Sequence, residues 1–194
     1  MPDEARLVDT GAGRAPQGDG WFVLNAADAT WMRNDHFGAR CNFETDGRLA
    51  IERPELHVQQ HPQIGIRLHV LEPGKPSTMY HRESNQEDFL VLSGECLLIV
   101  EGEERHLRAW DLVHCPPGTR HAFVGAGEGP CVMLMVGART DEGGILYPRD
   151  ETALKHGAGV GADTEQPSVA YSPFGHWRLG RPDAWRELPW SRSS

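Results

Sequence analysis

The stretch that decides the fold is DFLVLSGECLLIVEGEERHLRAWDLVHCPPGTRHAFVGAGEGPCVMLMVGA, residues 88–138. In it, short apolar runs are separated by turn signals such as Ser93-Gly94 and Glu101-Gly102, at intervals of roughly 8–12 residues. Short strands with that spacing predict an all-β sandwich or barrel. The runs CLLIV and VMLMV are apolar at every position, as is typical of strands buried on both faces. We therefore expect a second sheet or a partner subunit to cover them.

Ionisable side chains stand directly before this stretch. In YHRESNQEDFLVLSG, residues 80–94, the side chains of His81, Glu83 and Glu87 all have odd numbers. Side chains alternate between the faces of a strand, so without a bulge these three point to one side, together with Phe89. That side is then the apolar interior, where ionisable groups need a partner such as a bound cation. The alternative is that they are surface groups ahead of an ordinary strand.

Two segments of the chain resemble the two sequence motifs of the cupin family. The first motif opens with a glycine and ends with a glutamate, six residues and a second glycine, and Gly74, Glu87 and Gly94 fit this pattern. The second motif has Pro-x-Gly, two residues and a histidine, as in residues 116–121, where a tight turn precedes His121. The sequence departs from the second motif at two positions, Trp110 and Gly125, where the family has glycine and asparagine.

The first motif also contains a His-x-His pair, which this sequence matches in part. With four residues before Glu87, the two histidine positions fall on Tyr80 and Arg82, which are poor metal ligands. With three residues before it, they fall on His81 and Glu83. We prefer the second alignment because it keeps one histidine and puts a carboxylate in the other place.

The resemblance then implies one divalent metal ion per chain at the barrel mouth, with four ligands: His81, Glu83, Glu87 and His121. Two neutral imidazoles and two carboxylates around a divalent ion leave no net charge. Such a site is a mild Lewis acid and attracts anionic substrates less than a positive site does. These ligands suit Zn, Fe, Mn or Ni without separating them. If one glutamate does not bind, two histidines and one carboxylate remain, which is the arrangement of iron oxygenases.

The resemblance covers residues 62–138 and implies a single jelly-roll β-barrel with N- and C-terminal extensions. Residues 1–20, rich in Gly, Pro, Asp and Ala, are expected to be loosely ordered. Residues 21–140 are expected to form the barrel with its N-terminal strands. Residues 141–194 are expected to pack on the barrel or on a partner subunit, because they contain three tryptophans: Trp177, Trp185 and Trp190.

The composition limits the partners of the protein. The chain has 19 Lys and Arg against 28 Asp and Glu, a formal net charge of −9, which argues against nucleic acid as a partner. We see no apolar run long enough for a transmembrane helix and no secretory signal, so we expect a cytoplasmic protein with no membrane partner. The cysteines, far apart and without a CxxC pair, are expected to be reduced and buried: Cys41, Cys96, Cys115 and Cys131. Cupins commonly pair, so the resemblance implies a homodimer.

The function is less determined than the fold, because one fold hosts many activities. A metal site with open positions in an apolar barrel predicts a metal-dependent oxidoreductase, dioxygenase-like, acting on a small organic substrate. The sequence leaves open whether the protein is an enzyme. One alternative is a non-catalytic small-molecule-binding or accessory protein with a structural metal, and another is an isomerase acting on a sugar. The acidic balance and the absence of a basic cluster argue against phosphorylated substrates.

Overall fold

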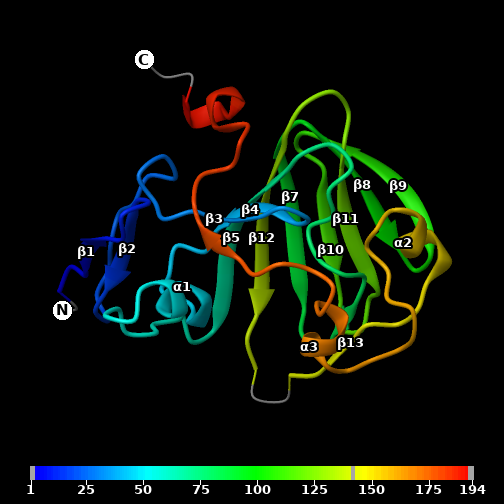
Figure 1. Cartoon of the computed structure of the whole chain (residues 1–194), viewed down its shortest axis with the longest axis horizontal. Coiled ribbons are helices and arrows are strands. Elements are labelled where there is room, and N and C mark those ends of the chain that lie inside the picture. The colour runs from blue at the N-terminus through cyan, green and yellow to red at the C-terminus, as the bar shows by residue number, and fades with distance from the viewer. Residues whose placement is uncertain (1–2, 141–142, 192–194) are drawn as a thin grey trace.

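Two facing antiparallel sheets form a barrel in the computed structural model, which describes residues 3–140 and 143–191 (Figure 1). The larger sheet contains seven strands in the order β10-β7-β12-β5-β4-β3-β14, and the smaller one contains three in the order β11-β8-β9. The all-β class and the single jelly-roll barrel predicted from the sequence are confirmed.

The strands of the larger sheet are β10 (Leu112–Cys115), β7 (Glu87–Ser93), β12 (Cys131–Ala138), β5 (Ile64–Leu71), β4 (Gly38–Cys41), β3 (Met32–Asn34) and β14 (Arg178–Leu179). Those of the smaller sheet are β11 (His121–Ala126), β8 (Glu95–Val100) and β9 (Glu103–Arg108). Two further pairs join β1 (Arg6–Asp9) to β2 (Arg14–Gln17) and β13 (Ile145–Leu146) to β6 (Arg82–Glu83). The helices are short: α1 (Gly47–Glu52), α2 (Glu151–Lys155), α3 (Pro167–Ala170), and the 3₁₀ turns η1 (Trp185–Glu187) and η2 (Pro189–Ser191).

The main hydrophobic core lies between the two sheets. Phe89 and Val91 of β7, which the alternation of the sequence assigns to the interior, are 4% and 0% exposed. They pack with Met133 of β12 on one side and with Leu98 and Phe123 of the smaller sheet on the other. Burial of each such side chain contributes roughly 1.5–3 kcal/mol. This core holds the two sheets together below the mouth of the barrel.

Segments of the same chain cover the outer faces of the fully apolar strands. Val132 of β12 points away from the main core and packs in a second cluster around Trp31. Ile99 of β8 packs in a third cluster with Tyr80 and with Ala153 of α2. The sequence predicted a second sheet or a partner subunit over these runs. Among the described residues, the N- and C-terminal segments cover the outer face of β12 at Val132, and α2 covers that of β8 at Ile99.

Two glycines allow the turns that bring the strands into register. Gly94 joins β7 to β8 at φ +75°, and a Cβ atom there would overlap the carbonyl oxygen of Pro130. Gly118 sits in the turn between β10 and β11 at φ +88°, a region that favours glycine. This second turn lets β11 begin at His121, opposite Val100 of β8.

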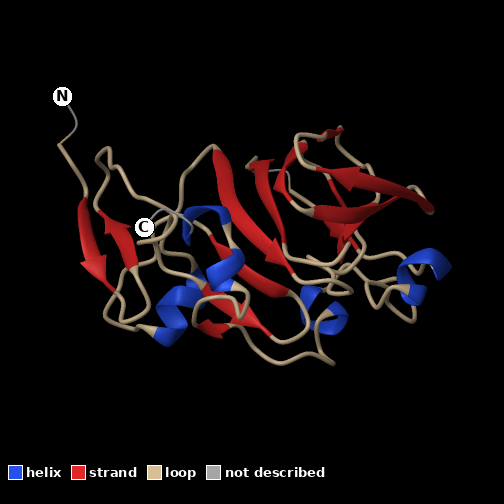
Figure 2. Ribbon diagram, turned by 90° about the horizontal axis from the view of Figure 1, so that it is seen from above, coloured by secondary structure: helices blue, strands red, loops and turns tan. Residues whose placement is uncertain are grey.

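The N-terminus differs from the loosely ordered start expected for residues 1–20. Strands β1 and β2 form an antiparallel hairpin at the end of the molecule away from the smaller sheet (Figure 2). Ala15 of β2 is 3% exposed and packs with Leu49 of α1. The side chains of Thr10 and Thr30 make a buried hydrogen bond of 2.7 Å. The composition of residues 1–20 did not predict this packing, because the partner residues, Leu49 and Thr30, lie outside the segment.

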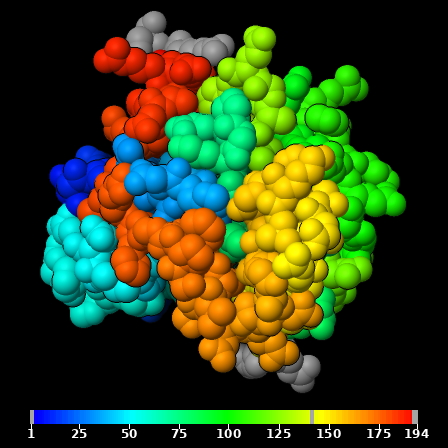
Figure 3. Space-filling model, turned by 45° about the vertical axis from the view of Figure 1, so that its right-hand side comes forward, coloured from blue at the N-terminus to red at the C-terminus, as the bar shows by residue number. Residues whose placement is uncertain are grey.

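The C-terminal segment, residues 176–191, packs back on the first strands of the chain. Figure 3 shows it, in orange to red, lying against the blue and cyan N-terminal segments. The ring centroids of Trp185 and Trp190 lie 5.8 Å and 5.3 Å from that of Trp31, which is fully buried. Strand β14 adds to the edge of the larger sheet by pairing with β3. The predicted domain limits 1–20, 21–140 and 141–194 stay predictions, and residues 1–2, 141–142 and 192–194 within them lie outside the described residues.

Two smaller expectations concern thiols and membranes. The predicted state of the cysteines is confirmed, since all are buried free thiols: Cys41, Cys96, Cys115 and Cys131. Among the residues that the structure describes, no helix has the length and the apolar character needed to span a bilayer.

Candidate metal centre

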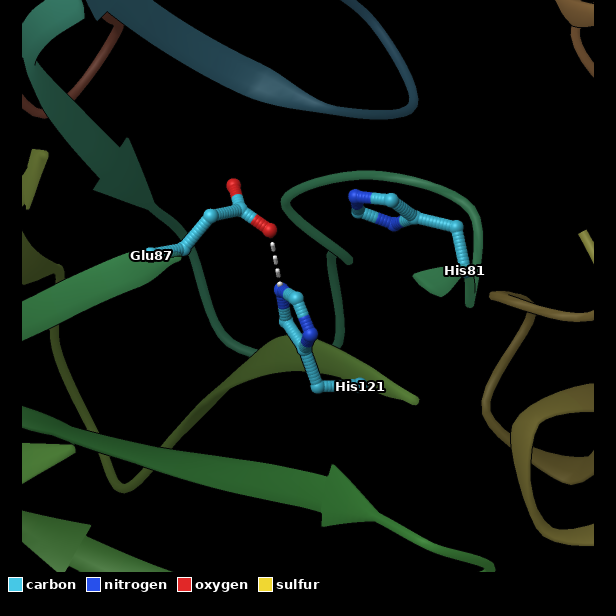
Figure 4. Close-up of side chains that lie close together, drawn as sticks. All are labelled: His81, Glu87 and His121. Carbon is cyan, nitrogen blue, oxygen red and sulfur yellow. Dashed lines mark ion pairs between the residues drawn. The ribbon is translucent and has the colours of Figure 1, made fainter. Parts of the chain in front are cut away.

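Three of the four predicted ligands meet at the barrel mouth. His81, Glu87 and His121 each offer one ligand atom, and these atoms all lie within 4.8 Å of one another (Figure 4). Glu87 is the first residue of β7 and His121 is the first of β11. His81 lies opposite His121, and their backbones exchange hydrogen bonds of 3.1 Å and 2.8 Å. The three residues are 5%, 8% and 2% exposed, in sequence order.

The two imidazole rings are held in the orientation that a metal site needs. Nδ1 of His81 lies 2.8 Å from the carbonyl oxygen of Met79, and Nδ1 of His121 lies 3.1 Å from that of Thr119. A carbonyl oxygen only accepts hydrogen bonds, so each Nδ1 must carry the proton. In the neutral ring, Nε2 then keeps its lone pair, and Nε2 of His121 faces Glu87 Oε2 at 3.4 Å. Such a carbonyl behind a histidine is the usual support of a metal ligand.

Burial and the neighbouring charges shift the pKa of each of the three groups. Burial raises the pKa of Glu87 to about 7, and the neighbouring Glu83 carboxylate adds to this. Burial and the charge of His81 lower the pKa of His121 to about 4. Burial acts to lower the pKa of His81 too, but the nearby Glu83 and Glu87 outweigh it and raise this pKa. A divalent cation would displace the bound protons and balance the carboxylate charge.

Glu83 lies beside the three-residue group. Its Oε1 atom is 3.7 Å from Nε2 of His81, and its side chain is 34% exposed. The nearby His81 lowers the pKa of Glu83, so its carboxylate stays ionised. The single continuous strand assumed for residues 81–91 is wrong, because a bend at Ser84 and Asn85 separates β6 from β7. Whether Glu83 binds the metal stays a prediction.

The other alignment of the His-x-His pair finds no support at the site. The ring of Tyr80 is fully buried in the cluster beneath α2, and its hydroxyl accepts a 3.0 Å hydrogen bond from the backbone of Gly102. Arg82 is exposed. Neither residue lines the cavity at the metal group.

A cavity of about 230 Å³ adjoins the three-residue group. Part of its wall is aromatic: Phe37, Phe89, Phe123, Tyr147, Tyr171 and Trp177. Three arginines far apart in the sequence also line it: Arg40, Arg48 and Arg67. The sequence analysis did not identify the three arginines. The one local signal was the alternation of IGIRLHVL, which puts Arg67 and His69 on the face of β5 opposite its apolar residues.

Comparison with known proteins agrees with this architecture. Residues 67–137 match the family model described as a cupin domain. No curated protein sequence matches the chain.

Three solved structures illustrate the range of similar proteins. One, provisionally named a sugar phosphate isomerase, is from Acidithiobacillus ferrooxidans; it is 29% identical, with a TM-score of 0.43, and the match covers 56% of this chain and 64% of that one. A sugar phosphate isomerase of the cupin superfamily from Silicibacter pomeroyi is 24% identical, with a TM-score of 0.46, over 67% of this chain and 77% of that one. The polyketide cyclase RemF from Streptomyces resistomycificus is 16% identical, with a TM-score of 0.46, over 60% and 78%. By the match to the family model, residues 67–137 form a cupin domain.

Proposed function

We propose that the protein binds one divalent metal ion per chain and uses it to act on a small organic substrate in the adjoining cavity. The observation that carries this proposal is the buried group of His81, Glu87 and His121, in which a backbone carbonyl oxygen fixes each imidazole ring. The residues fit a metal because the group combines two lone-pair donors with a buried carboxylate. Glu83 is the fourth ligand predicted by the alignment with the cupin motif, and its carboxylate lies beside His81.

The chain itself supplies orientation and shielding. The carbonyl oxygens of Met79 and Thr119 hold the imidazole rings before any metal binds, which lowers the reorganisation needed on binding. Phe89 packs beside His121 with a ring-centroid distance of 5.1 Å and shields one side of the group from water. A bound ion would supply Lewis acidity, and iron would add redox chemistry.

The reaction class that we propose is a dioxygenase-like oxidation. The group of His81, Glu87 and His121 has the ligand types of non-haem iron oxygenases, and with Glu83 also bound a six-coordinate ion would still have open positions. The cavity beside the group provides room for a substrate. The oxygen-uptake experiment below compares it with a non-catalytic binding protein that has a structural metal. An isomerase acting on a sugar is the remaining alternative, and substrate-dependent oxygen uptake would count against it.

The first measurement is elemental analysis of tag-free protein purified without chelator. We expect about one equivalent of iron, manganese, zinc or nickel per chain in the wild type and a large loss in His121→Asn. His106→Asn is the matched control, because His106 is an exposed histidine on β9. If the wild type contains no metal and takes up none on dialysis, the metal-site proposal is wrong.

The second measurement separates enzyme from binding protein. Protein loaded anaerobically with Fe(II) is mixed with oxygenated buffer and a panel of small aromatics, diketones and thiols, and oxygen uptake is recorded. Uptake that requires both a panel member and an intact His121 supports the oxidoreductase. A metal-containing protein that gives no uptake, and that loses much of its thermal stability on chelation, is instead a binding protein with a structural metal.

A further inference from the structure

Three guanidinium groups from different elements contribute to the wall of the metal-site cavity. Arg40 comes from β4, Arg48 from α1 and Arg67 from β5, and all three line the cavity of about 230 Å³. The same three arginines line a second cavity of about 330 Å³, which also shares Glu83 and Glu87 with the first. The arginines therefore stand where the two cavities meet, next to the metal group.

Two of the three arginines have no ion-pair partner in the part of the chain that the structure describes. Arg40 is 5% exposed and forms an ion pair of 3.1 Å with Asp46, and its Nε atom has no hydrogen-bond partner. Neither Arg48 nor Arg67 forms an ion pair within 4.0 Å among the described residues. Burial, followed by the charges of Arg67 and Arg48, lowers the pKa of Arg40 to about 9. Arg48 and Arg67 therefore line the cavity without an ion-pair partner from the described residues, although Glu83 and Glu87 also line it, and two such guanidinium groups can bind an anion.

The charge of Arg67 also reaches the metal group. It contributes to the lowering of the pKa of Glu83, and it opposes the rise in the pKa of Glu87. An anion held by Arg67 would therefore lie near both the arginines and the metal ligands. This changes the expectation from the sequence that the site attracts anions weakly, because that expectation counted only the four predicted ligands.

The aromatic part of the cavity wall, which includes residues in contact with the arginines, is suited to a flat apolar group. Tyr147 and Tyr171 meet edge to face with centroids 5.7 Å apart, and Trp177 carries the guanidinium of Arg40 4.2 Å from its ring centroid. The cavity volume of about 230 Å³ is below the roughly 300–1,000 Å³ typical of sites for drug-sized ligands, so the occupant is small. Arginine recognises carboxylate in a planar, two-pronged geometry.

We propose that the cavity binds a small organic carboxylate with a flat apolar body. Arg67 and Arg48 hold the carboxylate, buried Arg40 supports them, and Tyr147, Tyr171 and Trp177 contact the body. This inference rests on the proposed function in taking the metal-site cavity as the substrate site. It names the substrate class of that site, which the sequence analysis left open.

The test uses benzoate as the probe and benzamide as its neutral counterpart of the same shape. Binding to the full chain is measured by calorimetry. We expect benzoate to bind at least about tenfold more tightly than benzamide, and this preference to shrink at high salt. Arg67→Gln and Arg48→Gln should each weaken benzoate binding about tenfold, and Arg48→Gln should leave the metal content unchanged.

Two features of the design keep the inference falsifiable. Arg48 is exposed on α1, so Arg48→Gln tests the idea even if Arg67→Gln disturbs the fold, and exposed Arg82→Gln is the matched control outside the cavity. Equal binding of benzamide and benzoate, or benzoate binding that neither arginine variant changes, would overturn the inference. Glucose 6-phosphate or inorganic phosphate binding in place of benzoate would overturn the carboxylate class. Arginine-dependent benzoate binding by a protein that takes up no metal would uphold the inference and refute the metal-site proposal.

Discussion

Backbone carbonyl oxygens, rather than other side chains, orient both histidines of the metal centre. Met79 precedes His81 by two residues and Thr119 precedes His121 by two, so each ring is fixed by its own local turn. This local support makes the two ring orientations independent of the carboxylates. The carboxylates then decide how strongly the metal is held and what charge it keeps.

The role of Glu83 is tested by its removal. We expect Glu83→Ala to weaken metal binding about tenfold or more, because a carboxylate next to His81 is lost, and Glu87→Ala to weaken it further, because Glu87 is the buried carboxylate of the group. Chelator competition followed by elemental analysis measures both effects. Arg82→Ala, which removes an exposed neighbouring side chain, should leave the metal content unchanged. Full retention of metal by Glu83→Ala means that Glu83 is not a ligand.

At the scale of the element, strand β7 shows how far the local pattern reaches. The alternation of the sequence correctly assigns Glu87, Phe89 and Val91 to the interior, since all three lie on one regular strand. It gives His81 and Glu83 the same side by assuming one strand, whereas Glu83 belongs to β6, whose partner is β13, Ile145–Leu146. A partner more than 60 residues away leaves no periodic mark in the sequence around residue 83. The three arginines were missed for the same reason, because only the fold brings β4, α1 and β5 to one cavity.

The turn before β11 positions His121 and is a suitable place to perturb an element. Gly118 has φ +88° with open space around a Cβ atom, so Gly118→Ala introduces backbone strain without a clash. We expect a loss of stability of about 1–2 kcal/mol, the cost of the left-handed conformation for alanine. Urea unfolding measures it. Gly129→Ala is the control, because Gly129 also has open space but not a positive φ; an equal loss in both variants would contradict the strain argument.

On the scale of the whole molecule, the C-terminal segment closes the outer face of the larger sheet. Leu188 is fully buried and belongs to the cluster that contains Trp31 and Val132. The three tryptophans signalled a packed segment in the sequence, but not that it would pack on β3 and β4 of its own chain. The predicted homodimer and the cytoplasmic location stay predictions; sedimentation of the full chain measures the first.

Removing part of this segment should destabilise the whole fold. We expect Leu188→Ala to cost about 2–5 kcal/mol of unfolding free energy, because it leaves a cavity in a closed cluster. Val23→Ala, at a position 77% exposed, should change stability little. Thermal and urea unfolding compare the two variants. If Leu188→Ala is as mild as Val23→Ala, the segment does not pack in solution as described.

The stability of the molecule should also depend on pH through His69. This residue is fully buried, and its Nε2 donates a 2.7 Å hydrogen bond to the carbonyl oxygen of Phe37. Burial, together with the charges of Arg67 and Arg40, lowers its pKa from 6.5 to about 3. The unfolded chain therefore binds a proton here that the folded chain does not bind. This contribution to stability is complete above about pH 6.5 and is lost progressively as the pH falls towards 3.

His69→Gln isolates that contribution, since the amide can still donate to Phe37 but does not titrate. Between about pH 7 and pH 5, the wild type should lose about 2 kcal/mol more unfolding free energy than the variant. Urea unfolding at the two pH values gives the difference. The same pH dependence in both proteins would show that His69 is not the group responsible.

The proposed metal ligands and much of the cavity wall come from different parts of the chain. His81, Glu87 and His121 all fall inside the cupin domain, residues 67–137. Most of the side chains that would contact a substrate fall outside it: Phe37, Arg40, Arg48, Tyr147, Tyr171 and Trp177. Recombination that exchanges the flanking segments would thus alter what the protein recognises and keep the proposed metal ligands unchanged. Chimaeras that join this domain to the flanks of another cupin would be a direct route to new specificities.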